Sequence, residues 1–401
     1  MKVERVEVVA VQVSPPPELA ALRALKGEWV FVVAHGAFGV RGYGEATHSG
    51  DDDACARLVR QAWGPALDDE ALPDDPNGLE EWVRLASPPG TDPSRDRVAA
   101  TAYSAVETAL CDLAARTREV PLWQWLGDAD ARGGPAAPTS AHGIPLYATL
   151  NRGIFDRSPA GFADAARRAQ AEGFTRVKCA PFDGVERGGA LSDSRQAAIT
   201  QGIDRVAAVR EAVGPNVELM VDCHGRLSET EAIEVAIQLA ALGVIWFEEP
   251  VPFDPDPSPL ARVRRAVRSH PNHPVIAAGE LMFGVDGFRP LLESAAVDHV
   301  MPDVKHCGGL LAARTITREA AQRGVGAAPH NPSGPISTLA SAHLCAALGG
   351  MLEYAWGEVP WRASLLTPTE HIRDGALYLP EGPGLGADLD PDTLREHAFA
   401  L

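Results

Sequence analysis

The spacing of apolar residues changes along the chain and predicts two kinds of structure. The first part reads as three strands followed by helices. Apolar and polar residues alternate in the strands, and apolar residues recur every three or four positions in the helices. The expected elements are strands over Val3–Val13, Glu28–Ala34 and Val40–Glu45 and helices over Ala54–Trp63 and Val98–Arg116. We therefore expect a small α+β domain over residues 1–135.

From Ile144 onward, short apolar runs alternate with amphipathic segments. The runs predict strands over Leu146–Leu150, Arg176–Cys179, Glu218–Val221, Val244–Phe247, Val275–Ala278, His299–Met301, Val325–Ala328 and Met351–Tyr354. Helices fit between them, for example Arg195–Val213 and Gly309–Arg323. Repeated β-α units favour a closed parallel barrel over residues 143–362, with an open doubly wound sheet as the alternative. Residues 363–401 have few strand or helix signals and are expected to pack back on the first domain.

The composition argues against some classes of binding partner. The formal net charge is −18, and no basic block is present that could neutralise phosphates, which argues against nucleic acid and anionic membranes. No apolar run approaches the roughly 18 residues of a membrane span, and no secretory signal is visible. The six cysteines include no C-x-x-C pair. We therefore expect reduced thiols in a cytoplasmic protein.

Ionisable residues close nearly every predicted barrel strand, where catalytic groups of such barrels lie. Three of them are carboxylates on successive strands: Asp222, Glu248 and Glu280. Together they form a set of hard oxygen ligands with positions left for water and substrate, which suits Mg²⁺ better than zinc. Such a cation can bind a substrate carboxylate and stabilise the enediolate that forms when the α-proton leaves.

A base is then required, and the sequence offers His330 at the end of the seventh strand. Asp303 closes the sixth strand, and a neighbouring aspartate can orient an imidazole, select its tautomer and raise its basicity. We therefore expect His330, oriented by Asp303, to be the base. The alternative for His330 alone is a histidine in a turn that is hydrogen-bonded to a local carbonyl. Lys178 ends the second strand, and the eighth strand carries Glu353.

Several segments, in order and at barrel spacing, resemble motifs of the mandelate racemase/muconate lactonizing enzyme-like group of the enolase superfamily. They are Gly42-Tyr-Gly-Glu45-Ala, the helix Ala102–Asp112, Trp246-Phe-Glu-Glu-Pro250, Ala278-Gly-Glu280, Pro302-Asp303 through Gly308-Gly309, and Pro383-Gly-Leu-Gly386. The resemblance covers nearly the whole chain. It implies a modified (β/α)7β barrel, an N-terminal α+β domain that caps the barrel mouth, and a symmetric homo-oligomer. Superfamily sites use a Lys or His base with one or two Mg²⁺ ions.

One departure from the group's pattern is informative. Many members carry two lysines, K-x-K, at the end of the second strand, whereas here Lys178-Cys-Ala180 supplies only the first. Loss of the second lysine argues against racemisation by two symmetric bases. Lys178 is then expected to contact a substrate carboxylate or the metal's surroundings, or to form a structural ion pair.

The segment Asp222-Cys-His224-Gly-Arg226 resembles the D-x-H-G-R segment of galactonate dehydratases and related acid-sugar dehydratases. The resemblance implies that His224 protonates the departing hydroxyl, with a supporting position behind the reacting groups as the alternative. Arg226 is expected to pair with a substrate oxygen or with a loop carboxylate.

These features predict a Mg²⁺-dependent hydro-lyase acting on a sugar acid, an aldonate or an aldarate. His330 would abstract the C2 proton, Glu353 would hydrogen-bond the enediolate, and His224 would protonate the 3-hydroxyl, giving a 2-keto-3-deoxy acid. An epimerase, racemase or cycloisomerase working through the same enediolate is the main alternative. A non-catalytic metal-binding barrel is the alternative of a different class.

Overall fold

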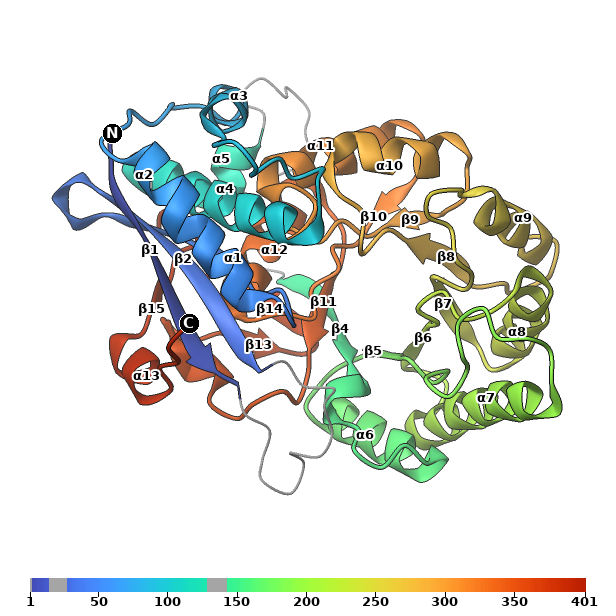
Figure 1. Cartoon of the computed structure of the whole chain (residues 1–401). Helices are drawn as coiled ribbons and strands as arrows, with labels where there is room; N and C mark the ends of the chain where they lie inside the picture. Colours follow the sequence, from blue (N-terminus) through green and yellow to red (C-terminus); the bar gives the residue numbers. More distant parts are fainter. Residues whose placement is uncertain (1, 14–26, 128–142) are drawn as a thin grey trace.

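The computed structural model describes residues 2–13, 27–127 and 143–401 (Figure 1). The expected end of the first domain, at residue 135, lies outside these residues. In residues 2–13 and 27–127 an antiparallel sheet runs in the order β1-β2-β3 beside a group of helices. The strands are β1 (Val3–Gln12), β2 (Glu28–Gly36) and β3 (Arg41–Glu45), and the helices are α1 (Asp52–Leu58), α2 (Gly64–Leu67), α3 (Pro76–Ala86), α4 (Arg97–Thr117) and α5 (Leu122–Leu126).

Helix α4 is the centre of this part of the molecule. Every residue from Ala99 to Ala115 is buried, because the helix has the sheet on one side and barrel helix α11 on another. Strand β3 comes so close that a Cβ at Gly44 would fall 1.9 Å from the carbonyl oxygen of Ala105. The glycine therefore permits the contact between sheet and helix. The helix expected over Ala54–Trp63 is α1 continued by a π-helical turn, Val59–Trp63.

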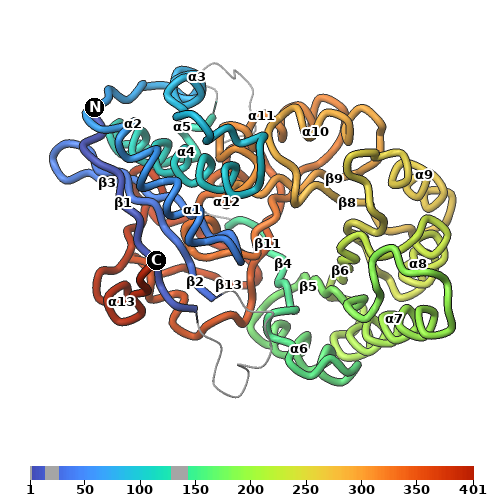
Figure 2. Tube along the Cα trace, in the orientation of Figure 1, coloured from blue at the N-terminus to red at the C-terminus, as the bar shows by residue number. Residues whose placement is uncertain are grey.

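The barrel occupies most of residues 143–401, where eight parallel strands alternate with seven helices (Figures 1 and 2). The strands are β4 (Ile144–Thr149), β5 (Arg176–Cys179), β6 (Glu218–Asp222), β7 (Val244–Glu248), β8 (Val275–Ala278), β9 (His299–Val300), β10 (Gly326–Ala327) and β11 (Leu352–Ala355). The helices are α6 (Pro159–Ala171), α7 (Asp193–Val213), α8 (Glu229–Ala241), α9 (Ser258–Val267), α10 (Gly284–Glu293), α11 (Gly309–Gln322) and α12 (Pro335–Leu348). The expected (β/α)7β barrel is confirmed.

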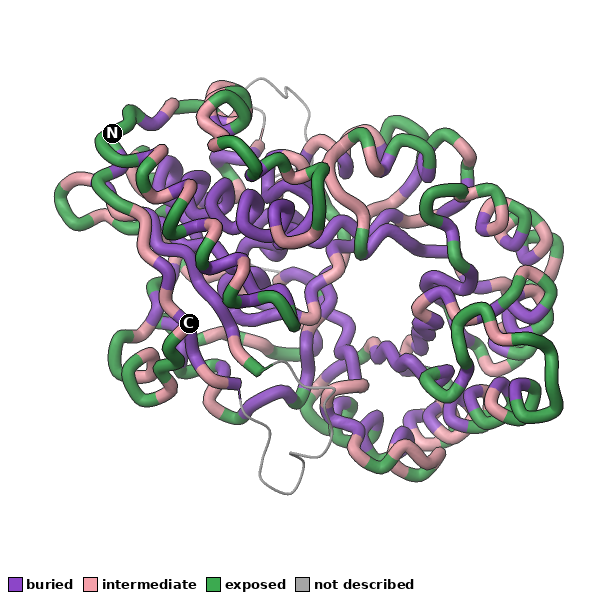
Figure 3. The backbone as a smooth tube through the Cα atoms, in the orientation of Figure 1, coloured by how far each residue is buried: buried purple, intermediate pink, exposed green. Residues whose placement is uncertain are grey.

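The strands pair in sequence order from β4 to β10, and β11 pairs with β4. No ladder joins β10 to β11 within residues 143–401. Instead, Asn331 bridges them, since its backbone N–H donates to Glu353 Oε2 at 3.0 Å and its Nδ2 donates to the Glu353 carbonyl at 3.1 Å. Figure 3 shows most of the barrel strands buried and the outer faces of the barrel helices exposed.

The last residues form short elements that the sequence did not signal. They are a 3₁₀ turn (Arg362–Leu365), β12 (Leu366–Thr367), β13 (His371–Arg373), β14 (Ala376–Tyr378), β15 (Asp388–Leu389) and α13 (Pro391–Glu396). Strands of two or three residues are too short to leave a periodic pattern. The chain end lies against β1, where the Phe399 N–H donates to the Ala10 carbonyl at 2.9 Å. The boundaries at residues 135 and 362 stay predictions.

Two carboxylates of the first part bind the first turns of barrel helices, whose N–H groups have no partner inside the helix. Glu107 on α4 accepts from the backbone N–H groups of Leu310 and Leu311 on α11, both at 2.8 Å. Glu45 at the end of β3 accepts from Gly334 at 2.8 Å and from Ser337 on α12 at 2.9 Å. Negative charge at these positions also suits the helix dipole.

No helix in the described parts of the chain has both the length and the apolar character that a membrane crossing requires.

Replacing Glu107 by alanine removes the acceptor of two buried N–H groups and leaves a cavity. We expect the Glu107→Ala variant to lose about 2–4 kcal/mol of the free energy of unfolding, because each unsatisfied buried donor costs about 1–3 kcal/mol. Glu107→Gln keeps one acceptor oxygen and should lose less. Urea denaturation followed by tryptophan fluorescence measures both.

The control is Glu211→Ala, which removes an exposed carboxylate on α7. A substitution at such a surface site should change stability by about 0.5 kcal/mol or less. If Glu107→Ala were as stable as this control, the contact between Glu107 and α11 would not hold the two parts together.

Candidate active site

The three carboxylates singled out in the sequence gather at the C-terminal ends of adjacent strands. Asp222 and Glu248 are the last residues of β6 and β7, and Glu280 follows β8 by two residues. All three are buried, with exposed fractions of 4%, 0% and 7%. The parallel pairing of β6, β7 and β8 brings them to one end of the barrel.

Among the described residues, Asp222, His224 and Glu280 form a group that could hold a metal ion. One ligand atom from each lies within 4.8 Å of the other two. His224 adopts a left-handed backbone conformation with φ of 49°, and its Nε2 lies 2.7 Å from Asp222 Oδ2. Glu280 Oε2 is buried and makes no well-aligned hydrogen bond with the described residues. Such an oxygen is suited to a cation.

Glu248 belongs to a different set of contacts. Its Oε1 accepts from Lys178 Nζ at 2.6 Å and its Oε2 accepts from Trp246 Nε1 at 2.8 Å. Lys178 Nζ also lies 3.1 Å from Glu353 Oε1. Lys178 is thus a buried cation between the carboxylates of Glu248, at the end of β7, and Glu353, within β11. This is the ion-pair arrangement that the sequence left open.

The barrel mouth holds more buried carboxylates than cations. Burial, together with the charges of Asp222 and other carboxylates, raises the pKa of Glu248 to about 8 even though Lys178 opposes the shift. Burial and the charge of Glu280 raise the pKa of Glu249 well above its usual range. Because like charges crowd here, a divalent cation would relieve the repulsion. The donor set therefore fits a hard divalent metal ion.

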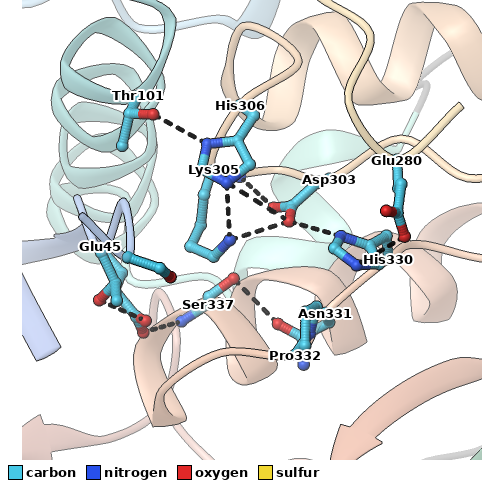
Figure 4. Close-up of polar contacts among 12 residues, drawn as sticks. Glu45, Thr101, Glu280, Asp303, Lys305, His306, His330, Asn331, Pro332 and Ser337 are labelled. Carbon is cyan, nitrogen blue, oxygen red and sulfur yellow. Dashed lines mark hydrogen bonds and ion pairs between the residues drawn. The ribbon is translucent and has the colours of Figure 1, made fainter. Parts of the chain in front are cut away.

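His330 and Asp303 meet as the sequence predicts (Figure 4). His330 Nδ1 lies 2.9 Å from Asp303 Oδ2, and His330 Nε2 lies 3.1 Å from Glu280 Oε2. Burial opposes protonation of His330, but the charges of Glu280 and Glu353 and the bond to Asp303 raise its pKa to about 10. The imidazole is therefore fixed at one nitrogen by Asp303, and the other nitrogen faces the group of potential metal ligands.

His224 lies on the β6 side of the same group and its side chain is 34% exposed. The adjacent Asp222 carboxylate, against the opposing effect of burial, raises the pKa of His224 to about 9. The charge of Asp222 therefore favours the protonated form of this ring.

Arg226 and Glu353 are held by protein groups. Arg226 Nη1 donates to the Val185 carbonyl at 2.7 Å, which ties the β6 loop to the loop after β5. Glu353 accepts from Thr149 Oγ1 at 2.5 Å through Oε1 and from Asn331 N–H at 3.0 Å through Oε2. Neither contact is the substrate contact that the sequence suggests, and those roles stay predictions.

Sequence reasoning missed two residues near the site. Arg187, in the loop after β5, lines a cavity of about 180 Å³ together with His224 and Glu249. Lys305 is buried and its Nζ lies 2.8 Å from Asp303 Oδ2. The signal for Lys305 was its place two residues after Asp303, which alternation would put on the same side of the chain.

Comparison with known families agrees with this architecture. Residues 3–127 match the mandelate racemase/muconate lactonizing enzyme N-terminal domain, and residues 161–393 match the enolase C-terminal domain-like family. The chain belongs to the mandelate racemase/muconate lactonizing enzyme group of the enolase superfamily. Membership of this superfamily implies an enzyme with a divalent metal ion, typically Mg²⁺.

Relatives with assigned names include sugar-acid dehydratases and a cycloisomerase. The chain is 30% identical to a D-xylonate dehydratase of Haloferax volcanii over 92% of this chain and 85% of the relative. It is 28% identical to a D-galactonate dehydratase of Ralstonia pickettii over 93% and 92% of the two chains. It is 27% identical to a D-galactarolactone cycloisomerase of Agrobacterium fabrum over 95% and 94%.

Among solved structures, a mandelate racemase/muconate lactonizing enzyme from a Sulfitobacter species superposes with a TM-score of 0.80 at 25% identity. The match covers 100% of this chain and 96% of the other.

Proposed function

We propose that this member of the group is a Mg²⁺-dependent hydro-lyase that dehydrates a sugar acid to a 2-keto-3-deoxy acid. The observation that carries the proposal is the pair of histidines at one group of carboxylates. His330 is held by Asp303 at 2.9 Å, and His224 lies against Asp222 at 2.7 Å. The dehydratase names of relatives support the same class of reaction.

The chain's own groups divide the reaction into two proton transfers. His330 in its neutral form takes the proton from C2 at Nε2, while Asp303 accepts the Nδ1–H and fixes the tautomer. A cation bound at Glu280 would offset the carboxylate charge that raises the His330 pKa, and so would favour this neutral form at neutral pH. His224 Nε2 gives its proton to the 3-hydroxyl as the C3–O bond breaks. Water leaves and the remaining enol becomes the 2-keto acid, so no oxidant is needed. A divalent cation at the carboxylates would stabilise the negative charge that develops on the substrate carboxylate.

Ala180 and Lys178 support this division of roles, whereas the ionised form of Glu353 counts against its hydrogen bond to the enediolate. Ala180 occupies the place of the second lysine of K-x-K, so no second base faces C2 from β5. Lys178 is positioned to balance negative charge at the barrel mouth. Glu353 is acceptor-only when ionised, and Lys178 and His330 outweigh burial to lower its pKa. Its proposed hydrogen bond to the enediolate therefore requires that it carry a proton.

The second candidate is a cycloisomerase or epimerase that forms the same enediolate. The relative named D-galactarolactone cycloisomerase favours it, since that protein matches over nearly the whole chain. Both candidates require C2 proton removal and differ only in the fate of the enediolate. Loss of water is therefore the deciding measurement.

For the metal, the proposed ligands are Asp222, Glu248 and Glu280, because Mg²⁺ prefers carboxylate oxygen to imidazole nitrogen. We expect Asp222→Asn, Glu248→Gln and Glu280→Gln each to weaken Mn²⁺ binding by about 10-fold or more, as for lost metal-site groups generally. His224→Asn should leave Mn²⁺ affinity nearly unchanged. Electron paramagnetic resonance of free Mn²⁺ measures each constant.

Glu211→Gln, which alters an exposed carboxylate on α7, is the matched control. The opposite pattern, with binding lost in His224→Asn and kept in Glu248→Gln, would replace Glu248 by His224 in the ligand set. His224 could not then serve as the proton donor.

For the reaction, the protein is incubated with Mg²⁺ and a library of aldonic and aldaric acids in D₂O. We expect one or more acids to give a 2-keto-3-deoxy product by ¹H NMR. His330→Asn should lower both C2 exchange and dehydration, and His224→Asn should lower dehydration alone. General acid or base catalysis contributes about 10²–10⁴-fold, and each loss should be of that size.

Full turnover in His224→Asn would contradict its assignment as the acid. Deuterium entering C2 without loss of water would favour the epimerase or cycloisomerase. Metal binding without C2 exchange on any acid would favour a non-catalytic barrel.

A further inference from the structure

A buried lysine contacts the carboxylate that orients the proposed base. Lys305 is 2% exposed, and its Nζ lies 2.8 Å from Asp303 Oδ2. The same oxygen lies 2.9 Å from His330 Nδ1, so one carboxylate oxygen is shared by the lysine and the histidine (Figure 4). The backbone N–H of Lys305 also donates to Asp303 Oδ1 at 2.8 Å.

A series of polar contacts links Lys305 to helix α4. Its Nζ is 3.2 Å from His306 Nε2, and His306 Nδ1 is 2.8 Å from Thr101 Oγ1 on α4. Thr101 is itself fully buried. Polar contacts therefore run without interruption from α4 through His306 and Lys305 to Asp303.

Burying an ammonium group costs free energy unless a carboxylate pairs with it, and Asp303 is the carboxylate that pairs with Lys305. Asp303 is fully buried, and burial alone would favour its neutral form. The charges of Lys305 and His306 and the bond to His330 nevertheless hold the pKa of Asp303 well below its usual range. Asp303 therefore remains an acceptor for both neighbours, with its carboxylate plane fixed by donors on two sides.

We propose that Lys305 is a positioning residue for the base: its ammonium group holds the Asp303 carboxylate so that Oδ2 accepts from His330 Nδ1. Lys305 acts through Asp303 and does not touch the substrate. The inference rests on the proposed role of His330. An error of about 1 Å in the placement of a reacting group can cost about 100-fold in rate, so the contact bears on turnover as well as on folding.

The test compares Lys305→Met, which keeps an unbranched chain but removes the charge, with Lys305→Arg, which keeps the charge. With an acid that the wild-type enzyme turns over, we expect Lys305→Met to lower kcat for C2 exchange by about 10-fold to 100-fold. KM for the acid and Mn²⁺ affinity should change by about 2-fold or less, because Lys305 is proposed to act only through Asp303. Lys305→Arg should recover part of kcat.

Thr101→Val is the matched control, since it removes the hydrogen bond at the other end of the chain of contacts without touching Asp303. It should keep kcat near that of the wild type. An equal loss in Thr101→Val and Lys305→Met would mean that the contacts only hold the two parts together, and the proposal would be wrong.

A double variant isolates the route through Asp303. Asp303→Asn/Lys305→Met should be no slower than Asp303→Asn, because the lysine then has no carboxylate to hold. If the losses of kcat caused by Asp303→Asn and by Lys305→Met multiplied in the double variant, the proposal would be wrong. The double variant also removes both buried charges, so it carries the test if Lys305→Met alone fails to fold.

A crystal structure of Lys305→Met, or of the double variant beside Asp303→Asn, separates this inference from the proposed function. In Lys305→Met, we expect the Asp303 side chain to turn away from His330 Nδ1. If the contact stays at its original length and kcat is unchanged, Lys305 has no positioning role. A wild-type protein that acts on no acid would instead count against the proposed function.

Discussion

The structure depends on two carboxylates that reach into the barrel from residues 2–13 and 27–127, the capping part of the molecule. Glu107 and Glu45 bind the first turns of α11 and α12, respectively. Helix α11 begins six residues after Asp303, and α12 begins five residues after His330. The two segments that carry the His330–Asp303 pair are therefore anchored at their far ends by the capping part. At Gly309, where φ is 87°, the approach is so close that a Cβ would fall 1.9 Å from Glu107 Oε2.

Most of the fold and much of the candidate site could be predicted from the sequence, because both follow from strand ends. In a parallel barrel the C-terminal ends of adjacent strands meet, so Asp303 and His330 could be paired without a structure. Alternation places Trp246 and Glu248 on one side of β7, and their side chains do meet at 2.8 Å. The short strands after residue 363 could not be found, since two residues carry no period.

The contacts that could not be predicted from the sequence depend on tertiary packing. Arg226 is held by the backbone carbonyl of Val185, and carbonyl acceptors exist at every position. The place of Lys305 two residues after Asp303 indicates on which side of the chain it lies, but not that its ammonium group is buried, which the tertiary structure imposes. Glu248 and His224 both lie next to Asp222 in the fold. Which of them places a ligand atom near those of Asp222 and Glu280 depends on the side-chain rotamers, and in this structure it is His224. Such choices arise from packing between distant segments, which no local pattern records.

The order of the strands places the two histidines on different sides of the barrel. His224 follows β6 and His330 follows β10, four places apart in the order of an eight-stranded barrel, with Glu280 after β8 between them. Groups on opposite sides of a central ligand can act on neighbouring carbons of one substrate, as elimination across C2–C3 requires. Racemisation needs two groups facing the same carbon, and Ala180 on the β5 side supplies none. The separation of His224 from His330 would therefore let the proposed acid and the proposed base act in the same step without exchanging a proton with each other.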